Sequence, residues 1–383
     1  MSQSLRLIFL ASLFLVLDGC VGPFEPELSL DADLLIVESM LTDLPETQFV
    51  KISRSRAVYG TSATTPIGKA RVEVLINETT RLPLRESKPG YYELPEGFRG
   101  RVGERYQLQF QTAEGVRYQS TVETMPAVPP IEKLYDTFDD QGIVNPERTK
   151  ITPANLIYLD TQDPDDVRNF YSWTWTLWER QAWCASCTQG LYYLNSDARS
   201  GICVFTRSLP TNNVYDYGCF GACWEILRSS ETNLFADIYT NGRPLTGRVV
   251  ARIPFYQAVP ALVEIRQSSL TPDAYRYFKL LENQTQNTGS LADTPPSPLV
   301  GNVRNLGDEH ENVVGYFTAS ATASVRYWLA RQNTTGNLIG FFQALNNRPI
   351  NPEPPSAPPP RPPSAACVLS ETRTPIKPEG WRQ

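Results

Sequence analysis

Histidine is almost absent from this chain, which has one, His310, among 383 residues. It lies in the polar segment 307–311, so we interpret it as a solvated surface side chain. A single histidine excludes a multi-histidine metal site and the HExxH motif, and no G-x-S-x-G motif accompanies it for a serine triad. Walker A and dinucleotide-binding glycine patterns are also missing. We therefore expect a protein that is not an enzyme.

Long apolar segments and an excess of positive charge are also missing. No segment reaches the run of about 18 apolar residues that indicates a transmembrane helix. The formal net charge is −6, and no basic stripe with interleaved aromatic residues is present. These features argue against a membrane-spanning helix and against nucleic acid as a partner.

The first 20 residues have the pattern of a bacterial lipoprotein export signal. Arg6 supplies a positive charge, and the apolar stretch of 11 residues that follows is too short to span a bilayer. This stretch ends in the sequence LDGC, a lipobox in which a small residue precedes the cleaved bond and the Cys20 thiol accepts a diacylglyceryl group. We predict a signal peptide over residues 1–19, lipidation of Cys20, and a lipid anchor and tether over residues 20–32. Several acyl chains anchor a protein stably, whereas a single chain binds reversibly.

The residues behind the lipobox bear on where the protein is delivered. Residue 21 is valine, whereas many Gram-negative bacteria use aspartate at this position to retain a lipoprotein in the inner membrane. Glu25 and Glu27 follow closely, and some surface-exported lipoproteins carry acidic residues there. We expect an outer-membrane lipoprotein, on the cell surface rather than on the periplasmic face.

Six cysteines follow Cys20, and five of them fall between residues 184 and 223. They are Cys184, Cys187, Cys203, Cys219, Cys223 and Cys367. An even number of clustered cysteines in an oxidising compartment indicates a disulfide set, whose connectivity the spacing leaves open. Cys184-x-x-Cys187 and Cys219-x-x-x-Cys223 could instead supply four thiolates to a zinc ion. We predict disulfides and no bound metal.

The remaining pattern predicts an all-β protein. Short segments of alternating apolar and polar residues, separated by turn residues, predict an immunoglobulin-like or transthyretin-like β-sandwich over residues 33–128. A proline-rich boundary leads to a larger β-rich domain with a few short helices over residues 131–345. This domain contains a cysteine-clamped insertion at 184–223. Residues 346–383 form a proline-rich C-terminal tail.

One segment of the larger domain has a helical pattern. Residues 269–283 place apolar side chains on one stripe, as an amphipathic helix requires. Thr271 and the proline after it suit the N-terminal cap and the first turn.

An acidic loop precedes the central strand of the larger domain. It contains Asp160, Asp163, Asp165 and Asp166. Such a loop can ligate calcium, which binds several oxygens. The spacing is not that of an EF-hand, however, so we interpret it as a solvated loop and expect no cofactor.

Aromatic residues suggest a surface for a partner or a ligand. Tyr171, Trp173, Trp175 and Leu177 alternate along one strand, and we assign this face to the core rather than to a binding platform. The cysteine-clamped insertion is our prediction for the contact surface, because disulfides pre-organise irregular loops and aromatic residues are favoured interface anchors. The residues are Trp183, Tyr192, Tyr193, Tyr215, Tyr217, Phe220 and Trp224. The alternative is that these rings pack around the disulfides.

Several sequence blocks resemble a known family. The blocks PPSPLVGNVRN at 295–305 and NVVGYFTAS at 312–320 are the most specific, and Cys223-Trp224 and the closing KPEGW at 377–381 also fit. They resemble the Bacteroidota lipoprotein family of domain of unknown function 4249. The family often has paired cysteines before the final tryptophan, whereas this chain has only Cys367 there. Family members often occur beside TonB-dependent outer-membrane receptors, and no catalytic residues carry over.

The resemblance implies an accessory role, similar in logic to the surface lipoproteins that cap Sus-type nutrient transporters. We expect a non-catalytic binding partner of a TonB-dependent receptor that helps to capture or take up a nutrient. One alternative is a structural lipoprotein that aids the assembly or stability of an outer-membrane complex. A third is a surface glycan-binding module or a hydrolase.

Overall fold

The computed structural model describes residues 34–58, 61–145, 149–165, 167–285, 299–332, 334, 338–355 and 364–382. The predicted signal peptide, Cys20, the tether and Asp166 lie outside these ranges. The described chain is mostly β-strand, as predicted, with helices α2 (Pro272–Thr285) and α3 (Phe341–Asn346). Within these ranges, no helix combines the length and the apolar character needed to cross a membrane.

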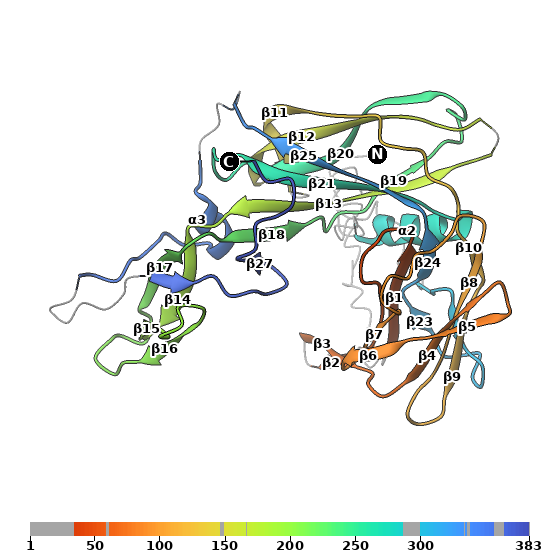
Figure 1. Ribbon diagram of the computed structural model, residues 1–383, viewed down its shortest axis with the longest axis horizontal. Helices are drawn as coiled ribbons and strands as arrows, with labels where there is room; N and C mark the ends of the chain where they lie inside the picture. The colour runs from red at the N-terminus through yellow and green to blue at the C-terminus, as the bar shows by residue number, and fades with distance from the viewer. Residues whose placement is uncertain are drawn as a thin grey trace, which may run out of the picture.

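The first β-sandwich packs two sheets against each other (Figure 1). One sheet has the order β23 (Val313–Val314), β1 (Leu34–Thr42), β2 (Phe49–Val58), β7 (Tyr91–Glu93) and β6 (Arg85–Lys88), with β24 (Phe317–Ser320) on β1 and β3 (Thr61–Pro66) on β2. The other has the order β22 (Val303–Asn305), β9 (Arg117–Ser120), β8 (Arg105–Gln111), β4 (Arg71–Ile76) and β5 (Thr80–Pro83), with β10 (Glu123–Thr124) on β8. Alternate side chains, such as Tyr106, Leu108 and Phe110, are buried between the sheets, as the period of two requires.

Residues 33–128 do not complete this sandwich alone, which corrects the predicted division of the chain. Strands β22, β23 and β24 belong to it, although they come from the segment 131–345. β23 and β24 pair in parallel with β1, and β22 pairs antiparallel with β9. An unpaired edge strand exposes a row of N–H and C=O groups, and these later strands pair with one edge of each sheet, β1 in the first and β9 in the second. Alternation along a strand reveals its buried face but not its neighbours.

A second sandwich forms the body of the larger domain. One sheet has the order β11 (Lys133–Val144), β12 (Ile151–Gln162) and β20 (Pro244–Pro254). The other has the order β25 (Thr322–Leu329), β21 (Ala261–Ser269), β13 (Phe170–Arg180), β18 (Trp224–Arg228) and β27 (Arg373–Thr374), with β19 (Asn233–Ala236) on β13. Tyr171, Trp173 and Leu177 of β13 are buried and Trp175 is partly buried against the same core, which confirms the core assignment of this face.

The two sandwiches share a continuous stretch of chain. Only Ala321 separates β24, in the first sandwich, from β25, in the second. The buried Glu123 adds a polar junction, because it accepts hydrogen bonds from Thr271 at 2.7 Å and from Tyr316 at 3.2 Å. Thr271 also accepts a hydrogen bond from the Ala274 N–H at 3.3 Å, as expected of the cap of α2. These links fix one sandwich against the other.

Candidate functional site

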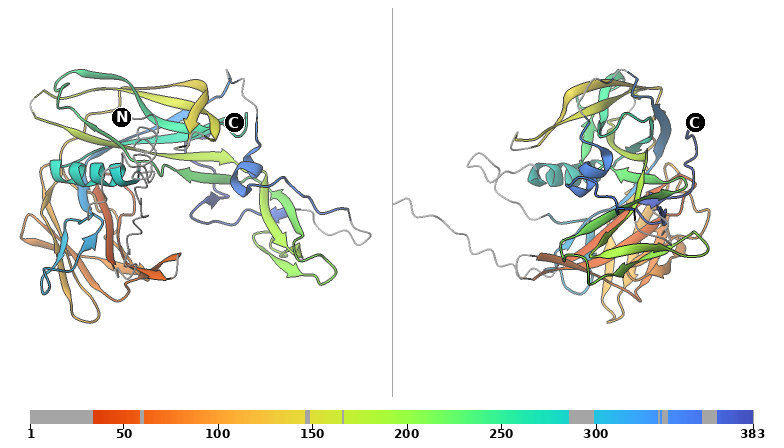
Figure 2. Two further views of the ribbon diagram at one scale, coloured as in Figure 1. Left: turned by 180° about the vertical axis from the view of Figure 1, so that it is seen from behind. Right: turned by 90° about the vertical axis from the view of Figure 1, so that its left-hand side faces the viewer.

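A disulfide-rich arm projects from the second sandwich (Figures 1 and 2). We define the arm as residues 183–223 together with the tail strand β26 (Ser364–Ala366). It contains a sheet of β14 (Trp183–Thr188), β17 (Val214–Phe220) and β26, and a hairpin of β15 (Gly190–Leu194) and β16 (Gly201–Phe205). The tail therefore returns to the body, since β26 pairs in parallel with β17 and β27 pairs with β18.

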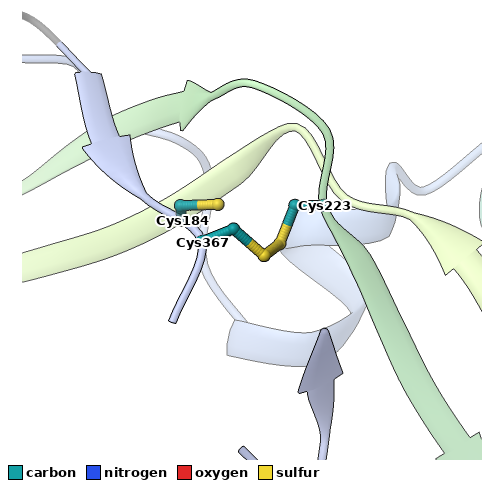
Figure 3. A group of neighbouring side chains, drawn as sticks. All are labelled: Cys184, Cys223 and Cys367. Atoms are coloured by element: carbon teal, nitrogen blue, oxygen red, sulfur yellow. A yellow bond between two sulfur atoms is a disulfide. The ribbon is translucent and has the colours of Figure 1, made fainter. Parts of the chain in front are cut away.

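Three disulfides hold the arm together, which confirms the predicted disulfide set. The pairs are Cys184–Cys219, Cys187–Cys203 and Cys223–Cys367. The sulfurs of Cys184, Cys223 and Cys367 lie within 4.8 Å of one another, and Figure 3 shows the Cys223–Cys367 bond beside Cys184. Zinc needs thiolates, and these sulfurs are all bonded in disulfides. The cluster is thus two adjacent cross-links, one within the arm and one that ties it to the tail.

Three of the seven aromatic residues predicted as a contact surface are buried. Tyr192 and Tyr217 pack on each other at 5.5 Å between ring centroids, within the cluster of the disulfides. Trp224 packs against Trp381 of the tail at 5.7 Å. For these three residues the prediction of an exposed surface is wrong. Tyr192 and Tyr217 belong to the small core around the disulfides, whereas Trp224 packs on the tail.

The other four aromatic residues remain accessible to different extents. Tyr193 is 41% exposed and Phe220 is 54% exposed. Tyr215 and Trp183 are partly buried, and Trp183 packs edge-on against Phe342 of α3 at 6.1 Å. The seven residues therefore do not form a single surface.

The most exposed apolar face of the arm was missed by sequence reasoning. In the β15–β16 hairpin, Leu191 pairs with Val204 and Tyr193 pairs with Ile202, so all four side chains share one face. Ile202 is 62% exposed, while on the opposite face Tyr192 is buried in the disulfide core and Cys203 is bonded to Cys187. We call these four residues the hairpin face. Alternation in the two short strands would have revealed it, but the prediction considered only aromatic residues.

The carboxylates of the acidic loop that the structure describes do not converge on one point. Asp160 accepts the Gly247 N–H at 2.8 Å. Asp163 is buried and accepts the Tyr171 hydroxyl at 2.6 Å, whereas Asp165 is exposed. Within the described residues, Asp160 and Asp163 thus bind different hydrogen-bond donors, and the three carboxylates do not form a ligand set.

A pair of buried carboxyl groups lies beside this loop. Burial raises the pKa of Asp163, and the neighbouring carboxylate of Asp237 raises it further. Asp237 is fully buried and accepts the Asn169 N–H at 2.8 Å through one oxygen. Its other oxygen has no hydrogen-bond donor among the described residues. Sequence spacing did not reveal this pair, because Asp237 comes from the loop after β19.

Comparison with known proteins gives one family. The profile described as "Domain of unknown function (DUF4249)" matches residues 21–326. The match covers the first sandwich, most of the second and the residues of the arm up to Cys223. No curated protein matches the chain.

Proposed function

The chain belongs to the DUF4249 family, and we propose that it is a non-catalytic outer-membrane lipoprotein that binds a TonB-dependent receptor and assists nutrient capture or uptake. The hairpin face at the end of the arm is the observation that carries this role. The family description names no function, so the support comes from the chain itself.

Two observations support the proposed place of action outside the cytoplasm. Three disulfides are typical of a protein that folds outside the reducing cytoplasm. The N-terminal signal pattern with Cys20 predicts export and lipid attachment. Tethering to the same membrane as a receptor raises the effective concentration of the two partners.

The arm has the physical properties of a docking element. Its irregular segments are pre-organised by the disulfides, so that less conformational entropy is lost when a partner binds. Burial of one exposed Ile or Val side chain contributes about 1.5–3 kcal/mol before the cost of association. Ile202 and Val204 are therefore the expected anchors, with Tyr193 beside them.

Co-purification from native outer membranes tests this role. The chain carries a C-terminal tag and is extracted in mild detergent, and its partners are identified by mass spectrometry. We compare the unaltered chain, the double variant Ile202→Ser/Val204→Ser, and the control Val102→Ser, which changes an exposed valine in the first sandwich. All three proteins must have similar melting temperatures.

We expect one TonB-dependent receptor to be recovered in near-equal amount with the unaltered chain and with the control. We expect the double variant to lose it. Recovery of the chain alone would overturn the proposed partnership. Recovery of a membrane complex that contains no receptor would favour the structural alternative instead.

A further inference from the structure

A groove runs between α2 and the first sandwich, away from the arm. It has a volume of about 550 Å³, within the range of roughly 300–1,000 Å³ that is usual for small-molecule sites. One side is formed by α2, and the other by the outward face of β1 and the start of β2. Residues of β23 and β24 complete the lining. Figure 1 shows α2 beside these strands.

Aromatic rings from three parts of the chain line this groove. They are Phe49, Tyr277, Phe278 and Tyr316. Tyr277 and Tyr316 lie 5.0 Å apart between ring centroids, and Phe278 lies 5.4 Å from Tyr277. Phe49 is 45% exposed, although it is a large apolar side chain at the start of a sandwich strand. Tyr277 and Tyr316 are buried, and Phe278 is partly buried. The aromatic surface that the fold leaves open in the groove is therefore formed by Phe49 and Phe278, with the two tyrosines beneath it.

The lining is held in place by the surrounding structure. The Tyr277 hydroxyl accepts the Gly315 N–H at 2.9 Å, and the Tyr316 hydroxyl donates to Glu123 at the junction. Gly315 has a φ of 92° and lies against the backbone of Val37. A lining whose side chains are already fixed loses little entropy when a ligand binds.

The charged side chains that line the groove are acidic. Among the described residues that form the groove, Glu38 and Glu46 are charged, and neither lysine nor arginine is present. Glu38 pairs with Lys51 at 2.6 Å and Glu46 with Arg266 at 2.7 Å, but these cations lie outside the lining. An anionic ligand would meet the two carboxylates, whereas a cation is attracted both to them and to the faces of aromatic rings.

We propose that this groove binds an organic cation with an apolar body, such as a quaternary ammonium compound that carries an aryl or alkyl group. The aromatic rings contact the apolar body and the ammonium methyl groups, and Glu38 and Glu46 supply the favourable potential. This site is independent of the hairpin face and of the receptor proposed above.

Three probes with the same phenyl body test the chemistry. They are the cation phenyltrimethylammonium, its neutral isostere tert-butylbenzene and the anion benzenesulfonate. Binding to the purified chain from residue 21 onward, which contains every described residue, is followed by ligand-observed NMR. We expect the cation to bind about tenfold more tightly than the neutral isostere, as a partly desolvated cation–π contact allows, and the anion not to bind.

Two arginine variants on α2 test the location. Leu281→Arg places a positive side chain in the groove, whereas Asn283→Arg places the same side chain on the exposed surface of the helix. We expect Leu281→Arg to abolish binding of the cation and Asn283→Arg to leave it unchanged, with similar melting temperatures for both. Glu38→Gln should weaken binding of the cation but not of tert-butylbenzene.

Each of three results would overturn this proposal. Equal affinity for the cation and the neutral isostere would show that the groove does not recognise the positive charge. Cation binding that survives Leu281→Arg would show that the cation binds elsewhere. Absence of binding at millimolar concentrations of the cation would show that the groove is not a site for it. None of these results depends on whether a receptor is recovered in the co-purification experiment.

Discussion

Arg266 donates two hydrogen bonds of 2.7 Å to the two carboxylate oxygens of Glu46, and this contact joins the second sandwich to the first. Arg266 lies on β21, and Glu46 lies in the loop between β1 and β2. The same guanidinium contacts the buried Glu264 at 2.9 Å, so it also satisfies a carboxylate of its own sheet. The junction thereby combines an ion pair with the continuous β24–β25 segment.

This contact should be measurable as a coupling energy. A double-mutant cycle with Arg266→Met and Glu46→Gln should give a coupling of about 1 kcal/mol in urea unfolding, because both side chains are partly exposed. The coupling should decrease at high salt, which screens exposed charges. A coupling of zero at low salt would show that the pair is not energetically relevant.

Gly315 should tolerate alanine far less than another glycine of similar backbone conformation. Gly97 has a φ of 75° and would meet no atom within 4 Å if it carried a Cβ, so Gly97→Ala should cost about 1 kcal/mol. At Gly315 a methyl group would overlap the Val37 carbonyl and force β1 away from β23. We expect Gly315→Ala to cost at least about 3 kcal/mol in urea unfolding, or to prevent folding. Equal costs at the two positions would contradict the packing at β1.

The Cys223–Cys367 disulfide should control release of the tail. It joins residues 144 positions apart, and the loop-entropy model predicts a stabilisation of about 4–5 kcal/mol for such a loop. Cys223→Ala/Cys367→Ala should therefore lower the melting temperature and expose the tail to limited proteolysis. Cys187→Ala/Cys203→Ala serves as the control, because that bond spans only 16 positions within the arm. Equal resistance of the tail in both variants would show that β27 and Trp381 suffice to hold it.

The buried Asp163–Asp237 pair should make stability depend on pH. The pKa of Asp163 is raised in the folded protein, so the folded state retains a proton that the unfolded state loses. Its contribution to the free energy of unfolding is present below the unfolded pKa, near 3.9, and is lost as the pH rises through the raised folded pKa. Asp237→Asn should reduce this loss, because it removes the neighbouring negative charge.

The exposed Asp165→Asn provides the control for this measurement. Urea unfolding at a series of pH values from about 4 to 8 compares the two variants with the unaltered chain. The control should keep the original pH dependence. If Asp237→Asn keeps it as well, the second carboxylate does not contribute to the raised pKa.

Chelation should leave the melting temperature unchanged. In the described structure Asp160 and Asp163 accept hydrogen bonds from different donors and Asp165 is exposed, so the three do not converge on one ion and chelation should have no effect. Thermal unfolding with EDTA and with millimolar calcium checks this expectation. A calcium-dependent increase in melting temperature would contradict it, since a ligand that binds the folded state stabilises it.

Much of the local structure followed from the sequence because local structure depends on neighbouring residues. Alternation of apolar side chains predicted strands within residues 33–128, of which β8 is one, and Thr271 marked the start of α2. The even number of clustered cysteines predicted disulfides, and residue blocks near the C-terminal end indicated the family. Each of these signals comes from a short segment or from composition, so it is present in the sequence whether or not the chain is folded.

Tertiary structure alone decided what lies far apart in sequence but close in space. It paired Cys223 with Cys367, brought β22–β24 to the first sandwich, and placed Asp237 beside Asp163. It also decided that Tyr217 is buried while Ile202 is exposed. A period of two records that a strand has two different faces, but which face meets solvent depends on the sheet packed against it. The solvent exposure of the hairpin face and the existence of the aromatic groove therefore became clear only in the folded chain.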